Sequence, residues 1–369
     1  MRIGIIDADL IGRTKHRFPN LASMKIAGYY KEIGNDIELL TTYDNIKDYD
    51  IVFVSKVFTD TPIDKAILEA DNVKYGGTGF FYDKAEPLPY EIEHHMPYYD
   101  LYKDWVDEQL ENGAKRKDLA CYLDYSIGFT TRGCFRQCPF CVNKKYKKVS
   151  KHSEISEFLD VNRKYITLLD DNILGYSGWK EIFEQLNATG KRFQYKQGMD
   201  ERILTKEKCE VLLNSRYYGD FMFAFDNIAD RDIIESKLQL WNSFPEAKKH
   251  NTKFYVLCGF DRQDKYDEAF WRQDIIDTFE RVKILMKYKC YPYIMRYEKY
   301  NDSPYRGTYV SLAGWCNTPA MYKKKSYREY CYSFQDKVKN GECAFVRYLK
   351  KIENDYPDIA KEYFDIKYE

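Results

Sequence analysis

The chain has 369 residues, which is enough for two or three domains with a substantial buried core. Lys plus Arg and Asp plus Glu both number 58, so the formal net charge is zero and no overall basic field attracts nucleic acid. No apolar run approaches the length of a membrane span, and no secretory signal precedes the strand-like start. These features predict a cytoplasmic protein without a membrane anchor, whose ten cysteines are free thiols.

Residues 1–82 alternate between strand and helix signals, which is typical of a parallel, doubly wound α/β sheet. The expected elements, in chain order, are Ile3–Ile6, Ala22–Lys31, Ile37–Leu40, Asp50–Val54, Pro62–Ala70 and Val73–Tyr75, of which the second and fifth are helices. Residues 83–120 are rich in Pro, Glu and Tyr and are predicted to be a connector with a polar helix near Trp105–Gly113. Within it, Glu93, His94 and His95 could ligate a metal. Adjacent histidines point in different directions on most backbones, so packing is the favoured interpretation.

Between Thr131 and Asn143 the sequence reads T-R-G-C-F-R-Q-C-P-F-C-V-N, a C-x3-C-x2-C array formed by Cys134, Cys138 and Cys141. Three thiolates on one short loop can bind three irons of a [4Fe–4S] cube and leave the fourth iron open to a small molecule. A structural zinc site is the alternative. It would need a fourth Cys or His at matching spacing, which the neighbouring sequence does not offer.

From residue 121 to residue 300 the strand–helix alternation resumes, and six strands are expected. They are Ser126–Thr130, Tyr165–Leu169, Phe193–Lys196, Phe221–Phe225, Lys253–Leu257 and Tyr291–Met295. The helices expected between them are Glu154–Val161, Gly178–Leu186, Lys206–Ser215, Asp230–Leu240 and Asp267–Lys287. The tail, residues 301–369, is expected to be mainly helical after Thr318. Its Cys316, Cys331 and Cys343 lack a close C-x2-C pair, so buried thiols are favoured over a second cluster.

The cysteine array, with Phe140 before its last cysteine, resembles the radical SAM superfamily. The resemblance implies a partial (β/α)6 barrel with the cysteine loop after its first strand and a functional site at the carboxyl ends of the strands. It implies two cofactors, a [4Fe–4S] cluster and S-adenosylmethionine (SAM), and an electron donor such as flavodoxin or ferredoxin. The implied activity is the formation of a 5′-deoxyadenosyl radical, which abstracts hydrogen from a small-molecule, peptide or RNA substrate that the sequence does not identify.

The first domain is similar to the cobalamin-binding-type, Rossmann-like domain that precedes this barrel in many enzymes. The phrases F-P-N-L-A-S-M-K-I-A-G-Y-Y, D-Y-D-I-V-F-V-S and K-Y-G-G-T-G occupy the places of its first helix, middle strand and Gly-Gly turn. In this family such domains carry an Asp-x-His-x-x-Gly loop whose histidine binds cobalt, and residues 1–82 contain no such loop. We therefore expect no bound cobalamin. The alternative, if cobalamin does bind, is a cobalamin-dependent methyltransferase. Methylthiotransferases use three further cysteines in this domain, whereas the first cysteine here is Cys121.

The resemblance also implies residues that meet SAM. Phe140 would pack beside the adenine, and one or more of Asp170, Asp171 and Asn172, after the second barrel strand, would receive the SAM amino group. A turn and helix cap is the alternative for these three residues. Gln197, after the third strand, could contact substrate or ribose.

Three further ligand candidates follow later strands. Asp226, after the fourth strand, matches a family acid that reaches the ribose or methionine portion of SAM. Gly259 stands where a glycine lets the adenine approach the backbone. Arg296 could bind a carboxylate or a substrate anion, or could form a salt bridge.

A lysine run follows the cysteine array at Lys144, Lys145, Lys147, Lys148 and Lys151. It could bind RNA phosphates, although a solvated helix start is the favoured interpretation. Two rival functions therefore remain. One is an iron–sulfur protein that binds or modifies nucleic acid, and the other is a zinc-stabilised structural protein.

Overall fold

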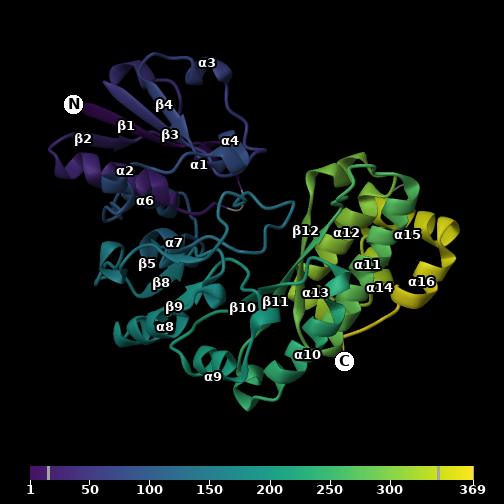
Figure 1. Ribbon diagram of the computed structural model, residues 1–369. Helices are drawn as coiled ribbons and strands as arrows, with labels where there is room; N and C mark the ends of the chain where they lie inside the picture. The colour runs from purple at the N-terminus through teal and green to yellow at the C-terminus, as the bar shows by residue number, and fades with distance from the viewer. Residues whose placement is uncertain (15–16, 339–340, 369) are drawn as a thin grey trace. The chain divides into compact units, whose positions relative to one another are not determined.

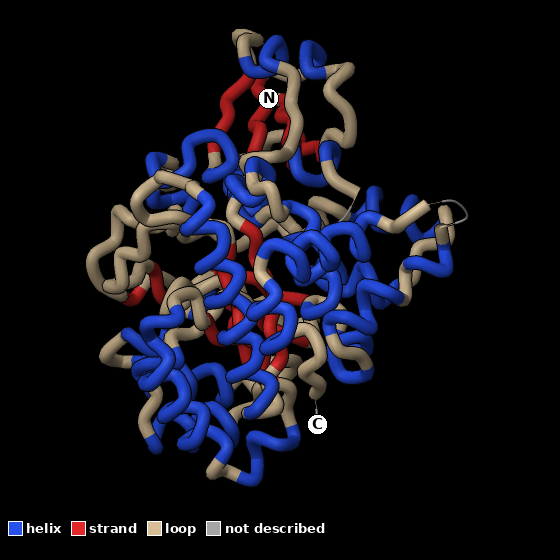
Figure 2. Tube along the Cα trace, turned by 90° about the vertical axis from the view of Figure 1, so that its right-hand side faces the viewer, coloured by secondary structure: helices blue, strands red, loops and turns tan. Residues whose placement is uncertain are grey.

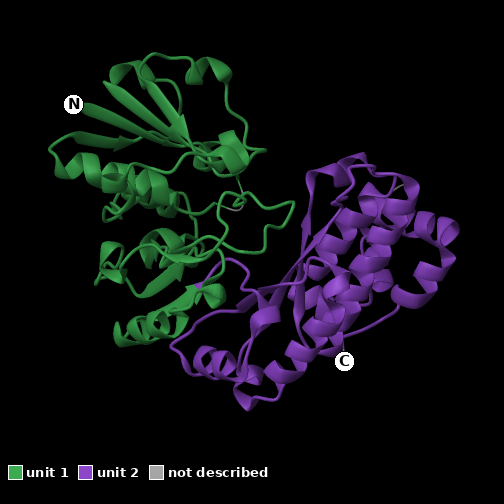
Figure 3. Ribbon diagram, viewed as in Figure 1, with its two compact units in different colours: residues 1–194 green, residues 195–369 purple. Residues whose placement is uncertain are grey.

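The computed structural model describes residues 1–14, 17–338 and 341–368. The chain divides into two compact units, Met1–Gln194 and Tyr195–Glu369 (Figure 3). The predicted boundaries at residues 82, 120 and 300 fall inside these units, so the finer division into four segments stays a prediction. None of the helices in the described part of the chain is long and apolar enough to cross a membrane.

The first unit begins with a four-stranded parallel sheet, as the alternating signals predict. In spatial order its strands are β2 (Asp36–Leu39), β1 (Arg2–Asp7), β3 (Ile51–Ser55) and β4 (Val73–Gly76) (Figure 1). The accompanying helices are α1 (Ala8–Gly12), α2 (Leu21–Glu32), α3 (Lys65–Leu68) and α4 (Thr78–Phe81). Because the strands are parallel, their carboxyl ends meet at one edge of the sheet, where ligands bind in open α/β folds.

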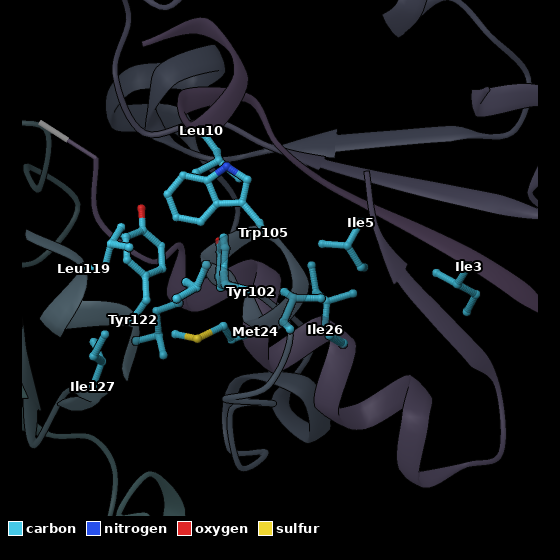
Figure 4. Packing of buried hydrophobic residues seen from close by; sticks show 14 of the residues in the cluster. Ile3, Ile5, Leu10, Met24, Ile26, Tyr102, Trp105, Leu119, Tyr122 and Ile127 are labelled. Carbon is cyan, nitrogen blue, oxygen red and sulfur yellow. The ribbon is translucent and has the colours of Figure 1, made fainter. Parts of the chain in front are cut away.

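The segment predicted as a connector contributes to the main hydrophobic cluster of the first unit. It contains α5 (Tyr90–Glu93), α6 (Lys103–Glu111) and the start of α7 (Ala120–Leu123). Tyr102 and Trp105 are buried together with Met24 of α2 and Ile127 of the next sheet (Figure 4). The Tyr102 hydroxyl also donates a hydrogen bond of 2.8 Å to the Asp7 carboxylate at the end of β1. Residues 83–120 therefore help to form a shared core.

A second sheet in the first unit carries the cysteine array. Its order is β5 (Tyr125–Gly128), β8 (Tyr165–Leu168) and β9 (Arg192–Tyr195), and α8 (Trp179–Ala188) lies between the last two strands in sequence. β5 and β8 run parallel. In the sequence between β5 and β8, β6 (Thr131–Arg132) and β7 (Ser150–Lys151) form a short antiparallel pair.

The helix predicted over Glu154–Val161 is wrong. That stretch contains only a short 3-10 turn, Ile155–Glu157. Phe158, which follows the turn, is 1% exposed, and a Cβ on Gly128 would lie only 2.2 Å from its ring. The Tyr99 hydroxyl also donates a hydrogen bond of 2.6 Å to the Phe158 carbonyl oxygen. Contacts with distant residues thus hold the segment in an irregular conformation and override its local helical pattern.

The second unit contains the parallel sheet β10 (Phe221–Ala224), β11 (Thr252–Cys258) and β12 (Tyr291–Arg296), in that order. A parallel bridge between Met199 and Phe223 joins the residues that follow β9 to β10. The helices α9 (Lys206–Asn214), α10 (Arg231–Asn242) and α11 (Glu268–Lys287) confirm the predicted alternation. The C-terminal part is helical, as predicted, with α12 (Arg306–Cys316), α13 (Pro319–Lys324), α14 (Tyr327–Tyr332), α15 (Ala344–Asp355) and α16 (Pro357–Tyr363) (Figure 2).

Glu201 is an unusual buried acid in the second unit. It is 1% exposed, and neither of its carboxylate oxygens accepts a hydrogen bond from the residues that the structure describes. Burial, together with the neighbouring Asp200 carboxylate, raises the pKa of Glu201 well above its ordinary value, although the positive charge of Lys237 opposes this. Glu201 is therefore protonated in the folded protein at a pH where the unfolded chain has lost this proton.

We expect the stability of the protein to respond to pH through Glu201. The free energy of unfolding should fall as the pH rises from the ordinary pKa of 4.5 through the raised folded-state pKa. Gln carries no such proton, so the stability of Glu201→Gln relative to the wild type should increase between about pH 5 and about pH 8. Urea denaturation at both pH values measures this difference. Glu210→Gln, at an exposed position on α9, is the control, and a pH-independent difference for Glu201→Gln would contradict the assignment.

Candidate metal centre

The cysteine array lies on a loop, residues 133–149, which we call the cysteine loop. Its two ends are joined by the β6–β7 pair, in which Thr131 lies opposite Lys151. Gly133 begins the loop with a φ of +95°, and a Cβ there would lie 2.3 Å from the Lys148 carbonyl oxygen. Only glycine fits this position, because other residues would be both strained and obstructed. The cysteine-bearing and lysine-bearing arms of the loop therefore pack directly against each other.

Asp170, at the end of β8, joins this strand to the residues that follow β5. Its carboxylate accepts four hydrogen bonds, from the backbone N–H and the hydroxyl group of both Thr130 and Thr131, at 2.6 to 3.0 Å. Burial raises the pKa of Asp170 to about 6, although these hydrogen bonds oppose the shift. These hydrogen bonds fit the alternative interpretation of Asp170, a structural role in the turn after the strand, and its role as a SAM ligand stays a prediction.

Asp171 holds the cysteine loop at two points. One carboxylate oxygen accepts a hydrogen bond of 2.7 Å from the Gly133 N–H, and the other accepts one from the Asn143 side-chain amide. Gly133 precedes the first cysteine of the array and Asn143 follows the last. Burial raises the pKa of Asp171, against the Gly133 bond and the positive charge of Arg132. Asp171 therefore connects both ends of the cysteine array to the carboxyl end of β8.

The thiols of Cys134, Cys138 and Cys141 are partly exposed, and none is in a disulfide. Backbone N–H groups point at two of the sulfurs: that of Arg136 at Cys134 Sγ (3.5 Å) and that of Asn143 at Cys141 Sγ (3.3 Å). Burial raises the pKa of the Cys141 thiol. Amide N–H groups directed at sulfur stabilise the thiolates of iron–sulfur sites and tune their potential. The donor set thus fits an iron–sulfur cluster bound by three cysteines.

Asn172 adds a side chain to the same site. It is 2% exposed, and its amide Nδ2 donates a hydrogen bond of 3.4 Å to Cys134 Sγ. Its Oδ1 is buried and has no hydrogen-bond partner among the described residues. A buried acceptor without a donor is costly, which makes this oxygen a position for a donor on a bound ligand.

Phe140 lies in the tight turn between the second and third cysteines, where the Cys141 N–H donates to the Cys138 carbonyl oxygen at 3.0 Å. The Phe140 carbonyl oxygen accepts a hydrogen bond of 2.7 Å from the Tyr82 hydroxyl, which follows α4. This contact between the cysteine loop and the first sheet region has no signal in the sequence. The adenine role of Phe140 stays a prediction.

Asp226 is placed at the end of β10, as predicted, where its carboxylate accepts a hydrogen bond of 3.1 Å from the Leu257 N–H of β11. The guanidinium of Arg281, on α11, donates to the carbonyl oxygens of Phe225, Asp226 and Leu257 at 2.9 to 3.1 Å. Burial raises the pKa of Asp226, although the positive charge of Arg281 lowers it. These contacts tie the ends of two strands together, and a ligand role for Asp226 stays a prediction.

Three other predicted ligand residues also lie in the second unit. Gln197 is exposed, just after β9. Gly259 has a φ of +74°, which favours glycine, and its N–H donates to the Asp274 carboxylate at 2.8 Å. Arg296 is exposed at the end of β12, and its guanidinium lies 4.5 Å from the centre of the Tyr300 ring. Contact of these residues with SAM or substrate stays a prediction.

The adjacent residues Glu93, His94 and His95 serve packing, as favoured from the sequence. His94 Nδ1 lies 2.7 Å from the Glu157 carboxylate, and His95 Nε2 lies 2.5 Å from that of Glu32. The two histidines therefore face different partners, one in the second sheet region and one on α2.

A buried aspartate, Asp9, follows β1 at the place where an Asp-x-His-x-x-Gly pattern would have its histidine. After β1 the chain reads Asp7-Ala-Asp-Leu-Ile-Gly12, which has the spacing of Asp-x-His-x-x-Gly with Asp9 in place of the histidine. Asp9 is 6% exposed, and its carboxylate accepts hydrogen bonds from the Val57 N–H (2.7 Å) and the Thr61 hydroxyl (2.5 Å). The chain therefore keeps the Asp and the Gly of the Asp-x-His-x-x-Gly pattern and lacks its histidine. The pattern is visible in the sequence, but the histidine that would identify it is replaced.

The three C-terminal cysteines are buried thiols. Cys316, Cys331 and Cys343 are 1%, 0% and 7% exposed, which confirms that they are buried. Burial raises the pKa of Cys331 to about 12 and that of Cys316 well above its ordinary value, which disfavours the thiolate form that metals require.

Across the residues that the structure describes, no three His, Cys, Asp or Glu side chains converge as ligands of a single metal ion. Neither protein-family models nor curated proteins give a match to this chain.

Proposed function

We propose that the protein is a radical SAM enzyme in which Cys134, Cys138 and Cys141 bind a [4Fe–4S] cluster. The observation that carries the proposal is the cysteine loop itself, which presents three thiols outside any disulfide, with amide donors aimed at the sulfurs of Cys134 and Cys141. No other cysteine occurs between Cys121 and Cys209, so a fourth thiolate from this region is excluded by the sequence. Three ligands without a fourth suit a cluster with one open iron and not a structural zinc ion.

When bound, the cluster supplies the electron that cleaves SAM to methionine and a 5′-deoxyadenosyl radical, which removes hydrogen from a substrate. The chain itself binds, orients and shields these groups. At the carboxyl end of β8, Asp171 holds the cysteine loop, and Asp170 holds Thr131 just before it. We assign the buried Oδ1 of Asn172 as the acceptor for the SAM ammonium group, because it is the oxygen of this trio that has no hydrogen-bond donor among the described residues.

The fold class is consistent with this proposal. β5 and β8 form one parallel pair, and β10, β11 and β12 form a second parallel series in chain order. The Met199–Phe223 bridge connects the residues after β9 to β10. We propose that these six strands form the partial barrel that the radical SAM resemblance implies.

Anaerobic reconstitution with iron and sulfide tests the proposed function. We expect about four irons and four sulfides per chain, as a [4Fe–4S] cluster requires, and 5′-deoxyadenosine when dithionite and SAM are added. If the protein instead purified with one tightly bound zinc ion and bound no iron, its assigned function would change from enzyme to zinc-stabilised structural protein. Cluster formation without any 5′-deoxyadenosine would favour an iron–sulfur nucleic-acid-binding protein instead.

We expect the protein to cleave SAM without cobalamin. The carboxylate of Asp9 stands at the position of the cobalt-binding histidine and is already engaged by Val57 and Thr61. A corrin would therefore lack an axial imidazole from this loop. Reconstitution with excess hydroxocobalamin, gel filtration and a visible spectrum check this expectation. Stoichiometric corrin that co-elutes with the protein would instead indicate a cobalamin-dependent methyltransferase.

A further inference from the structure

The cysteine loop and its flanks carry a concentrated positive charge. From Thr131 to Ser153 the sequence contains seven Lys or Arg residues and no Asp or Glu, although the whole chain has 58 of each sign. Such a local excess on a neutral chain produces a field confined to one region. It indicates a partner that approaches this region and carries negative charge.

Three lysines of the loop are available to such a partner. Lys145 donates a hydrogen bond of 2.8 Å to the Ala85 carbonyl oxygen, and Lys151 forms an ion pair with Glu154. By contrast, Lys144, Lys147 and Lys148 form no ion pair within the part of the chain that the structure describes, and the last two are exposed. We call these three the lysine arm.

The backbone of the lysine arm packs against the cysteine-bearing half of the loop. The Lys148 carbonyl oxygen lies where a side chain on Gly133 would project, and Gly133 directly precedes Cys134. The Gln137 side-chain amide donates to the Tyr146 carbonyl oxygen, which joins the two arms again farther along the loop. The thiols and the lysine arm are thus parts of one compact loop.

An exposed aromatic ring lies beside the same thiols. Phe135, which follows Cys134, is 40% exposed. Its ring packs near Gly175, and the Arg136 guanidinium lies 4.8 Å from the ring centre. An exposed aromatic ring with a cation beside it, on a basic loop, is typical of a transient protein interface, in which charge accelerates association and a modest apolar contact gives orientation.

We propose that the lysine arm and Phe135 form the docking surface for an acidic one-electron carrier protein. This proposal rests on the proposed function, because the cluster must receive an electron. One electron leaves the reduced flavin or iron–sulfur centre of the carrier and enters the cluster, and no covalent bond forms or breaks. Single-stranded RNA is less suited to this surface, because protein grooves that bind such RNA combine a row of stacking aromatic rings with a long basic track.

The test measures reduction of the reconstituted cluster by reduced flavodoxin in a stopped-flow experiment. At an ionic strength of about 10 mM, charges act over about 30 Å, so Lys144→Glu/Lys147→Glu/Lys148→Glu should lower the second-order rate constant about ten- to hundredfold. At about 1 M salt the difference should largely disappear, because the screening length falls to about 3 Å. Phe135→Ser should lower the rate at both salt concentrations.

Two controls separate docking from other effects. Lys47→Glu/Lys65→Glu/Lys115→Glu changes the net charge equally at exposed lysines outside the loop and should lower the rate constant much less than the lysine-arm variant does. Reduction by dithionite should be the same in all variants, because a small reductant needs no docking surface.

Unchanged flavodoxin kinetics in the lysine variant, with an intact cluster, would overturn the docking proposal and leave the enzyme proposal standing. If neither the wild type nor any variant assembled a cluster, both the docking proposal and the enzyme proposal would be overturned. If the variant lost binding of a fluorescent single-stranded RNA but kept the wild-type rate of reduction, the surface would be assigned to RNA instead.

Discussion

Replacement of Cys138 by Ala is expected to remove most of the cluster iron and all SAM cleavage. Each cysteine of the array would supply the thiolate for one iron, and the neighbouring sequence offers no substitute thiol. Cys138 is only partly buried, so the fold should survive the change with a small loss of stability. Iron and sulfide analysis, a visible spectrum and 5′-deoxyadenosine assays measure the effect.

Cys121→Ala is the matched control, because Cys121 is also partly buried and lies outside the cysteine loop. It should retain wild-type iron content and activity. Circular dichroism should show the same secondary structure in both variants. A Cys138→Ala protein that turned over SAM at the wild-type rate would refute the assignment of the metal centre.

Replacement of Glu93 by Ala is expected to give the largest loss of stability. The Lys25 side chain is 5% exposed, and its ammonium group donates to both the carboxylate (3.1 Å) and the carbonyl oxygen of Glu93. Burial lowers the pKa of Lys25, and the negative charge of Glu93 opposes this. Removal of the carboxylate leaves a buried ammonium without its counter-ion, which costs about 3–5 kcal/mol in comparable sites.

Urea denaturation of the protein, monitored by tryptophan fluorescence, measures this loss of stability. Glu91→Ala, at an exposed position on the same short helix, should change the free energy of unfolding by about 0.5 kcal/mol or less. The double variant Lys25→Met/Glu93→Ala should recover much of the stability, since it removes both charges. A loss below about 1 kcal/mol for Glu93→Ala alone would mean that water solvates Lys25 in the folded protein.

The Lys25–Glu93 pair also lies close to the cysteine loop's base. His152, directly after β7, places its Nε2 3.4 Å from the Glu93 carboxylate and stacks on His94 with ring centres 5.0 Å apart. Burial lowers the pKa of His152 to about 4, so it is neutral near pH 7. The charged pair thus connects α2 to the segment that closes the cysteine loop.

Local sequence patterns were sufficient to predict the strands. Each of the six strands expected between residues 121 and 300 ends within two residues of its observed bounds. Short apolar runs separated by polar stretches specify strands locally, because burial on both faces needs a continuous apolar segment. The spacing of Cys134, Cys138 and Cys141 likewise places three cysteines on one short loop whatever the fold, and their role as cluster ligands stays a prediction.

Contacts between distant parts of the chain decided the rest. Phe158 fills the space over Gly128 and prevents the helix expected around it, and Lys25 meets Glu93 across 68 residues of sequence. Asp170 and Asp171 turn toward Thr131 and Gly133 rather than outward, which no local pattern distinguishes from a ligand role. The sequence around a residue indicates whether its side chain is buried and whether it lies in a helix or a strand. Its hydrogen-bond partner depends on which segments pack together, and only the tertiary structure determines that.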